Sequence, residues 1–271
     1  DIPASMLDLD GNNSTATGTA YLGTFTEDGG GVRVADTDLS LAGPNNLVSV
    51  TVTLTNSKAG DVFSIFGSLP PGITASISGN VVVLSGSAAP AVYQTAIGAI
   101  RFNNTSDSPD TTPRTITVQA SDGTYVSNTA TATINVVQND DPPVLDLDAN
   151  NNTTAGTGYN TFFSLTTRPS VTIADTDVSV TDVDSTNVVG ATITLTNAKT
   201  GDSFSVGSLP PGITASVVGN VVTLSGSTFK TDYQTALKAV TFNSTSNDTS
   251  QRIITVTVKD DSNVDSNVAT T

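Results

Sequence analysis

The sequence contains no histidine, cysteine or tryptophan, and Glu27 is its only glutamate. Without His and Cys, the chain cannot build the usual Cys/His zinc sites, Ser–His–Asp or Cys–His nucleophilic centres, haem sites or disulfides. Basic residues are also scarce: 10 Lys and Arg face 25 Asp and Glu in 271 residues, a formal net charge of −15. Such a chain cannot neutralise a run of phosphates, so we expect no nucleic acid partner. No apolar run is long enough to cross a bilayer, so we expect no direct membrane insertion.

The acids that are present are almost all aspartates, 24 of the 25. Aspartate favours turns, caps and hard-cation sites, because its short side chain holds an oxygen close to the backbone. Thr, Val, Gly, Asn and Ser are abundant, which favours strands and turns over helices. The composition therefore indicates an all-β, acidic protein.

The chain repeats itself. The segment Leu69–Ser76 returns as Leu209–Ser216, 140 residues later, and Leu7–Asp10 returns as Leu145–Asp148, 138 residues later. A period near 140 residues has the size of a complete domain. We predict two tandem domains, at 1–141 and 142–271, with a Pro-containing linker at 138–143.

Within each repeat, apolar residues alternate with Ser and Thr, and Gly, Pro and Asn clusters separate the runs. This pattern predicts seven to nine short strands per repeat and an all-β fold, an antiparallel β-sandwich. Helical spacing over 89–100 and 229–240 predicts one short helix in each repeat, with Tyr93 and Tyr233 as core residues. The counterpart of strand 129–137 stops at Thr271, so we expect the last strand of the second repeat to be truncated, or completed by another chain.

Aspartates occur in Asp-x-Asp pairs, which in an extended strand would direct two carboxylates to one face. Like charges so placed repel each other unless a cation lies between them. Ca²⁺ suits such sites, because it accepts six to eight oxygen ligands in irregular geometry. The linker adds Asn139, Asp140 and Asp141. The predicted pairs are Asp8 with Asp10, Asp36 with Asp38, Asp146 with Asp148, Asp175 with Asp177, and Asp182 with Asp184.

Several motifs recur in the same order in both repeats: the Leu-Asp-Leu-Asp opening, Leu69-Pro-Pro-Gly72 and Leu84-Ser-Gly-Ser87. Together with the stretch 173–185 and the Asn139-Asp-Asp-Pro-Pro143 linker, they resemble the cadherin-like and Ig-like tandem repeats of large secreted bacterial adhesins. The resemblance covers nearly the whole chain. It implies Ca²⁺ at the domain junction, held by the linker Asn139, Asp140 and Asp141, by Glu27 of the preceding domain, and by Asp175 and Asp177 of the following one. The mid-domain Asp-x-Glu of cadherins is absent.

Other functions fit less well. The stretch from Asp8 to Asn12 resembles the start of an EF-hand loop, but no acid stands at the twelfth position. Paired carboxylates could hydrolyse a glycosidic bond, yet the acids lie in repeated turns without an aromatic platform, so we expect no enzyme. A carbohydrate-binding accessory module needs exposed Trp or Tyr side chains that stack on sugar rings, and this chain has no Trp. A Lys–Asn isopeptide at Lys58 or Lys199 lacks a neighbouring Glu. Asp61 and Asp202, in matching Gly-Asp turns, are interpreted as hairpin acids.

The sequence thus predicts a calcium-rigidified structural segment of a large extracellular or cell-surface bacterial adhesin or matrix protein. Its expected partners are neighbouring repeats of the same protein and a protein or glycan surface. The main alternative is a fibre subunit that is assembled by strand donation.

Overall fold

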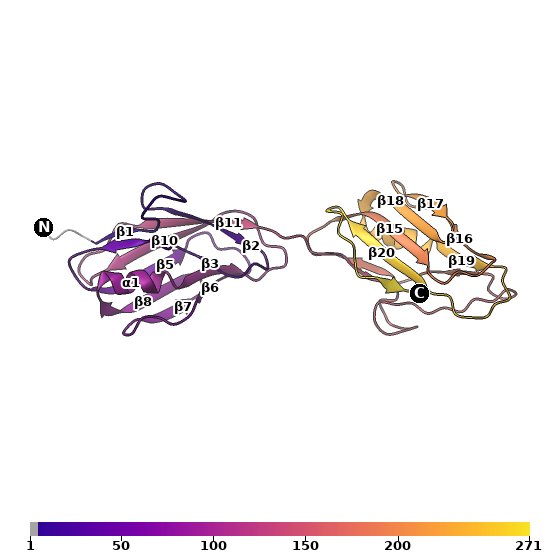
Figure 1. Ribbon diagram of the computed structural model, residues 1–271, viewed down its shortest axis with the longest axis horizontal. Helices are drawn as coiled ribbons and strands as arrows, with labels where there is room; N and C mark the ends of the chain where they lie inside the picture. Colours follow the sequence, from indigo (N-terminus) through magenta and orange to yellow (C-terminus); the bar gives the residue numbers. More distant parts are fainter. Residues whose placement is uncertain (1–4) are drawn as a thin grey trace. The chain divides into compact units, whose positions relative to one another are not determined.

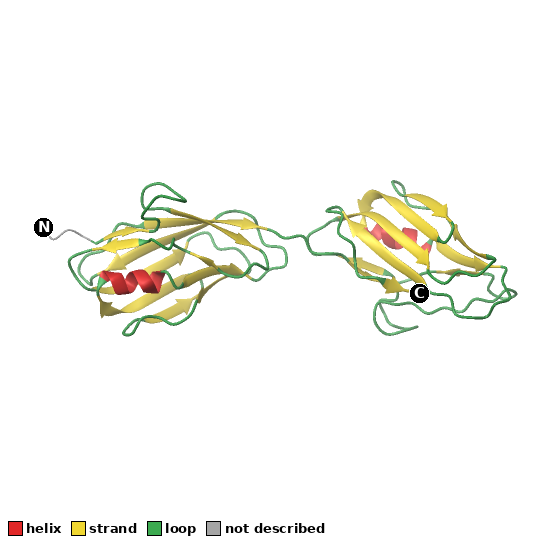
Figure 2. Ribbon diagram, viewed as in Figure 1, coloured by secondary structure: helices red, strands yellow, loops and turns green. Residues whose placement is uncertain are grey.

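The computed structural model describes residues 5–271, and the chain divides into two compact units (Figure 1). Unit one ends at Asn139 and unit two begins at Asp140, two residues before the boundary placed from the sequence. Both units are almost entirely β-structure, with one short helix each (Figure 2).

Unit one is built from eleven strands and a helix within the described residues. Several of the strands have only two or three residues, which is why the sequence pattern predicted fewer. The elements are β1 (Met6–Asp8), β2 (Tyr21–Thr26), β3 (Val32–Arg33), β4 (Ser40–Ala42), β5 (Leu47–Leu54), β6 (Asp61–Ile65), β7 (Thr74–Ser78), β8 (Val81–Ala88), α1 (Pro90–Ile97), β9 (Ile100–Asn104), β10 (Arg114–Ser121) and β11 (Ala130–Val137).

Unit two repeats this order, but it has no strand at the position of β2. Its elements are β12 (Val144–Asp146), β13 (Ser170–Thr172), β14 (Ser179–Thr181), β15 (Asn187–Leu195), β16 (Asp202–Val206), β17 (Thr214–Val218), β18 (Val221–Phe229), α2 (Lys230–Lys238), β19 (Val240–Ser244), β20 (Ile254–Asp260) and β21 (Ala269–Thr270).

Each unit is a β-sandwich of one large and one three-stranded sheet. In unit one the large sheet has the order β2-β11-β10-β5-β8-β7, and in unit two the order is β17-β18-β15-β20-β21. The smaller sheets are β3-β9-β6 and β13-β19-β16, and β1-β4 and β12-β14 form separate pairs. The antiparallel β-sandwich predicted from the sequence is confirmed, and among the strand pairs of the described residues only β2 and β11 run parallel.

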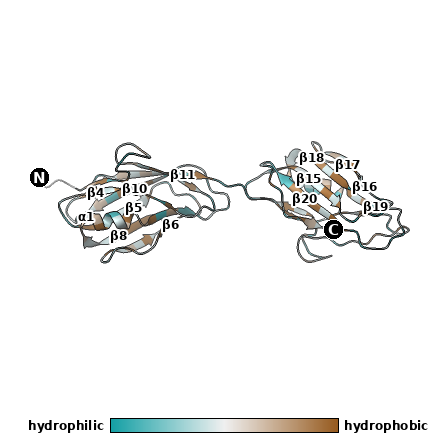
Figure 3. Ribbon diagram, viewed as in Figure 1, coloured by the Kyte–Doolittle hydropathy of each residue, from teal (hydrophilic) through white to brown (hydrophobic). Residues whose placement is uncertain are grey.

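Alternate strand residues form the two cores. In β10 and β11 every second side chain is buried, as the Val/Ile–Thr alternation predicted, and the brown apolar positions lie along the strands (Figure 3). The two cores are separate clusters of buried residues, one in each unit.

The two helices bring a tyrosine into each core. Tyr93 and Tyr233 are fully buried, and their hydroxyls donate to the carbonyl oxygens of Gly86 (2.6 Å) and Gly226 (2.7 Å). Burial raises the pKa of Tyr233 to about 12. Among residues 5–271, no helix is long and apolar enough to cross a membrane.

A buried ion pair fixes the turn before β6. The Arg114 Nε donates to Asp61 Oδ2 at 2.7 Å, and both side chains are fully buried. The counterpart in unit two joins Arg252 to Asp202. Asp61 and Asp202 are therefore structural acids. Lys58 and Lys199 form exposed ion pairs with Asp110 and Asp248.

Candidate metal centres

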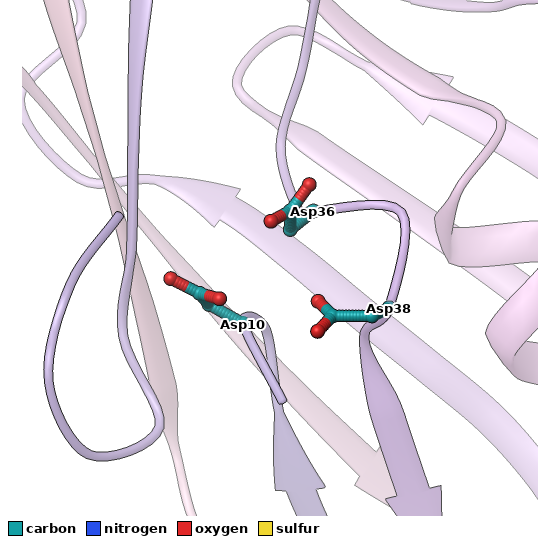
Figure 4. Close-up of side chains that lie close together, drawn as sticks. All are labelled: Asp10, Asp36 and Asp38. Carbon is teal, nitrogen blue, oxygen red and sulfur yellow. The ribbon is translucent and has the colours of Figure 1, made fainter. Parts of the chain in front are cut away.

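A cluster of three carboxylates lies at one edge of unit one. Asp10 follows β1, and Asp36 and Asp38 lie in the turn between β3 and β4. The Asp36 N–H donates to the carbonyl oxygen of Leu9 (2.8 Å), which draws the turn to the end of β1. Carboxylate oxygens of the three residues lie within 4.8 Å of one another (Figure 4). Asp10, Asp36 and Asp38 are thus brought together, although by turns and not by the extended strand that the sequence argument assumed.

Unit two repeats the cluster. Asp148 follows β12, and Asp175 and Asp177 occupy the turn before β14, with carboxylate oxygens again within 4.8 Å. The Asp175 N–H donates to the Leu147 carbonyl (2.9 Å), as its counterpart does in unit one. Two copies of one geometry indicate that the arrangement is a property of the repeat.

The first aspartate of each cluster also accepts hydrogen bonds from the loop that follows it. Asp10 is fully buried and accepts hydrogen bonds from the backbone N–H groups of Ser14 (3.0 Å), Thr15 (2.6 Å) and Ala16 (3.0 Å). Burial acts to raise the pKa of Asp10, but these hydrogen bonds outweigh it and hold the pKa well below its usual range. The pKa of Asp148 is lowered in the same way. Both carboxylates are therefore ionised at neutral pH.

The third aspartate of each cluster carries an oxygen that is not satisfied. The Oδ1 atoms of Asp38 and Asp177 are buried, yet they accept no hydrogen bond from the described residues. A buried polar atom without a partner is costly. A cation held between the three carboxylates would satisfy these oxygens.

Two of the predicted ligands that lie outside the clusters are the first aspartates of the Leu-Asp-Leu-Asp motifs. The Asp8 Oδ1 accepts the Asp10 N–H at 3.0 Å, and Asp146 does the same for Asp148. β1 and β12 end at Asp8 and Asp146, so the chain turns before the second aspartate of each pair. Asp8 and Asp146 therefore accept a backbone N–H from the second aspartate of each pair. Among the described residues, they are not members of the three-carboxylate clusters.

A second acidic region lies where unit two begins. The Asp141 N–H donates to Asp184 Oδ2 (3.1 Å), and Asp182 Oδ1 accepts the N–H groups of Asp184 (3.1 Å) and Ser185 (2.8 Å). Oδ2 of Asp140, Oδ2 of Asp182 and Oδ1 of Asp184 are buried and receive no hydrogen bond from the described chain. Burial raises the pKa of Asp182, and the adjacent carboxylate of Asp184 adds to the rise.

The linker therefore contacts a different Asp pair from the one that the resemblance implied. Asp177 precedes β14 and Asp182 follows it, so the two pairs flank opposite ends of this strand. Asp175 and Asp177 join Asp148, whereas Asp184 is bonded to Asp141. In unit one, the predicted ligand Glu27 accepts the N–H of Asn139 at 2.9 Å, so these two residues are in contact.

Sequence reasoning missed Asp260, which is fully buried at the end of β20. Its Oδ1 accepts the N–H groups of Ser262 (2.9 Å) and Val264 (2.8 Å), and its Oδ2 receives no hydrogen bond from the described residues. The next residue, Asp261, accepts from the Ser185 hydroxyl (2.6 Å), which ties this turn to the Asp182–Asp184 loop. The adjacent pair of acids directly after a predicted strand was the available signal.

At the position equivalent to Asp260, unit one has an aspartate with different hydrogen-bond partners. Asp122 is the counterpart of Asp260, and its Oδ1 likewise accepts two backbone N–H groups, from Thr124 and Tyr125. Its Oδ2 accepts the Asn45 amide (2.9 Å). The second carboxylate oxygen thus has an amide donor in unit one, whereas in unit two it receives no hydrogen bond from the described residues.

No protein-family profile and no curated protein sequence match this chain. Among solved structures, mouse cadherin-23 EC22-24 aligns over 100% of this chain and 65% of its own, at 14% identity and a TM-score of 0.38. Human CDH23 EC21-23 aligns over 98% and 63%, at 12% identity and a TM-score of 0.33. The BspA C-terminal domain of Streptococcus agalactiae aligns over 83% and 85%, at 10% identity and a TM-score of 0.23. The chain spans slightly less than two thirds of the two cadherin-23 structures, and its structural neighbours include these extracellular cadherin repeats.

Proposed function

We propose that this chain is a calcium-binding structural segment of an extracellular or cell-surface bacterial protein that mediates adhesion or assembly. The observation that supports it most is the set of buried carboxylate oxygens without hydrogen-bond donors, which includes Asp38 and Asp177 at matching positions of the two units.

Calcium fits these sites better than other common ions. All available ligands are oxygens: carboxylates, backbone carbonyls and Asn amides, which hard cations prefer. The clusters are assembled from turns of irregular geometry, which Ca²⁺ tolerates and Mg²⁺ does not. Extracellular modules bind Ca²⁺ with Kd values of about 10⁻⁴–10⁻³ M, close to the calcium concentration outside cells.

At the start of unit two, the ion would act on the linker. Asp141 already bonds to Asp184 through its backbone, and Asp140 places a further buried oxygen there. Calcium bound by Asp140, Asp182 and Asp184 would hold the first residues of unit two against its own sheet. The proposed role is therefore mechanical: calcium limits the conformational freedom of the linker end and stabilises each repeat.

Calcium is expected to raise the melting temperature of the chain relative to EDTA. At a concentration ten times Kd, one site contributes about 1.4 kcal/mol. For units of this size that corresponds to a rise of about 4 °C per site, which differential scanning calorimetry resolves. In small-angle scattering, EDTA should broaden the distribution of interatomic distances because the linker end is released.

Single substitutions test whether the calcium-dependent rise in melting temperature comes from the three-carboxylate clusters. Asp38→Asn and Asp177→Asn should each remove one binding event in a calorimetric titration, and Asp107→Asn, an exposed acid outside the clusters, should remove none. Mg²⁺ at the same concentration should give a smaller shift. A melting temperature that is equal in calcium and EDTA would rule the proposal out.

Asp260→Asn is expected to change the free energy of unfolding of unit two in opposite directions with and without calcium. Without calcium, the substitution replaces an unsatisfied buried carboxylate oxygen by a neutral group and stabilises unit two by about 1 kcal/mol. We include Asp260 Oδ2 among the ligands at the start of unit two, because the Ser185–Asp261 hydrogen bond ties its turn to the Asp182–Asp184 loop. With calcium, the substitution removes this charged ligand and destabilises the loaded protein. Urea unfolding with and without EDTA measures both effects.

The counterpart in unit one is the control. Asp122→Asn loses the hydrogen bond from Asn45, so it should destabilise unit one by about 1 kcal/mol whether or not calcium is present. If Asp260→Asn showed the same calcium-independent loss, Asp260 would be a structural acid like Asp122.

A further inference from the structure

Two arginines lie next to each other on unit one without a carboxylate partner. Arg33 of β3 and Arg101 of β9 are directly opposite each other in the antiparallel register. Like charges at such positions repel each other. Although the chain has 25 acids and only 10 Lys and Arg, neither arginine forms an ion pair with a described residue. The fold therefore holds two positive charges together, and no ion pair within residues 5–271 offsets their repulsion.

The two guanidinium groups are fixed at the C-terminal end of α1. Arg33 Nη1 donates to the carbonyl oxygen of Gly98 at 3.1 Å. Arg101 Nη1 donates to the same oxygen at 2.8 Å and to the carbonyl oxygen of Ile100 at 2.9 Å. The other guanidinium nitrogens have no acceptor among the described residues. Both side chains are thus held in place while most of their N–H groups stay available to a ligand.

The surroundings of Arg101 increase its attraction for an anion. The residue is only 9% exposed. Burial lowers the pKa of the Arg101 guanidinium, and the positive charge of Arg33 lowers it further. A negatively charged group that bound between the two arginines would relieve this repulsion.

The arginines line a pocket of about 480 Å³ beside α1. Phe66, directly after β6, also lines it and is 70% exposed, and the Arg101 Cζ lies 4.9 Å from the centroid of its ring. Ser68 and Thr95 add hydroxyl groups to the wall. The pocket thus combines two guanidinium groups, an exposed aromatic ring and hydroxyls.

One carboxylate also lines this pocket. The Asp36 oxygens accept the Thr37 N–H at 2.6 Å and the Ser14 hydroxyl at 3.0 Å, and they pair with neither arginine. Two guanidinium groups and one carboxylate leave the pocket with one net positive charge, which suits a monovalent anion. The planar fork of a guanidinium also matches a planar carboxylate through two parallel hydrogen bonds. The pocket therefore fits a carboxylate better than a doubly charged phosphate.

Unit two shows that the fold does not require these groups. Thr172 and Thr241 stand opposite each other at the positions of the two arginines. Gly207, whose N–H donates to the carbonyl oxygen after α2, stands at the position of Phe66. The same strands and helix form in both units, so the arginine pair and the exposed ring are additions that are specific to unit one.

We propose that this pocket of unit one binds a uronic acid residue of an acidic polysaccharide. Arg33 and Arg101 bind the sugar carboxylate, and the exposed ring of Phe66 packs against the apolar face of the sugar ring. Ser68 and Thr95 form hydrogen bonds with its hydroxyl groups. This binding does not depend on the calcium sites.

The probe is the trimer of galacturonic acid, titrated into the full chain and followed by NMR. We expect one trimer to bind per chain and to shift the Nε–H signals of Arg33 and Arg101, while that of Arg252 in unit two stays unchanged. The methyl ester of the trimer has the same rings without the charge, and it should bind at least about tenfold more weakly. Because Asp36 also belongs to the Asp10 cluster, the titrations are done in EDTA, so that their outcome is separate from that of the calcium experiments.

Three substitutions test the pocket residues. Arg33→Thr introduces the residue that unit two has at this position, and it should weaken binding of the trimer at least about tenfold. Phe66→Ala should weaken it several-fold, because the packing surface for the sugar ring is lost. The control is Lys58→Thr, which removes the same charge from an exposed ion pair outside the pocket and should leave the affinity unchanged. Thermal unfolding of each variant confirms that it is folded.

Equal affinity for the trimer and its methyl ester, or no shift of the arginine signals at millimolar trimer, would overturn the proposal. A tetra-aspartate peptide or inorganic phosphate that bound to the same arginines as tightly as the trimer would overturn it as well. The pocket would then recognise an acidic protein segment or any anion, and not a sugar acid.

Discussion

Asp61→Ala is expected to destabilise unit one by about 3–5 kcal/mol, because it leaves a buried guanidinium without its carboxylate. Arg114 and Asp61 are both fully buried, with Nε and Oδ2 2.7 Å apart. The same carboxylate also accepts the Asn104 amide and the Lys58 N–H, each at 2.7 Å. Removing it therefore breaks the ion pair and releases the turn that leads into β6.

Urea unfolding followed by circular dichroism measures this loss. The control is Asp110→Ala, which removes an acid that is 43% exposed and 3.8 Å from Arg114 Nη1, and it should cost less than about 1 kcal/mol. Asp202→Ala in unit two should cost less than Asp61→Ala, because Arg252 is 11% exposed and water can reach it. A loss below about 1 kcal/mol for Asp61→Ala would show that Arg114 finds other partners.

Gly86→Ala is expected to cost about 3 kcal/mol, because there is no room for a side chain. A Cβ at Gly86 would lie 2.0 Å from the Gly72 carbonyl oxygen, and its φ of +145° is one that L-residues rarely adopt. The Gly86 carbonyl also accepts the Tyr93 hydroxyl, so a shift of this backbone disturbs the buried tyrosine as well. Gly226→Ala should behave alike in unit two, where the distance is 1.9 Å.

Gly72→Ala is the matched control. Gly72 also has a positive φ, +83°, but nothing lies within 4 Å of the added Cβ. Only backbone strain remains, about 1–2 kcal/mol. Thermal unfolding of both variants separates the steric contact from the strain, and equal losses would show that the close approach of Gly72 is relieved by a small backbone shift.

Much of the fold could be predicted from periodicity. Alternation in β5, β10 and β11 fixed which side chains face the core, and the helical spacing around Tyr93 placed α1. The parallel pairing of β2 with β11 could not be predicted, because residues far apart in sequence meet there and nothing local records the strand direction. The hydrogen bond from the Tyr93 hydroxyl to the Gly86 carbonyl could not be predicted either, although the burial of Tyr93 in the core was expected.

The sequence argument did not predict how the aspartates of the candidate sites are grouped. The pairs around Asp36 and Asp175 do converge with Asp10 and Asp148, but by turns and not along a strand. Local spacing could not say which pair meets the linker, since that depends on the direction of β14. Asp260 was missed because its hydrogen bonds stay within its own turn, and the contact that ties this turn to the Asp182–Asp184 loop comes from Ser185, 76 residues away from Asp261. That these aspartates bind calcium stays a prediction.

The hydrogen bonds within the Asp10 loop have a kinetic consequence. Ser14, Thr15 and Ala16 hold this carboxylate in place through their own N–H groups, so one wall of the cluster is formed before any ion arrives. An entering ion has only the short turn of Asp36 and Asp38 left to arrange. For the calcium binding proposed above, uptake and release at this cluster would then be fast and would leave the loop folded.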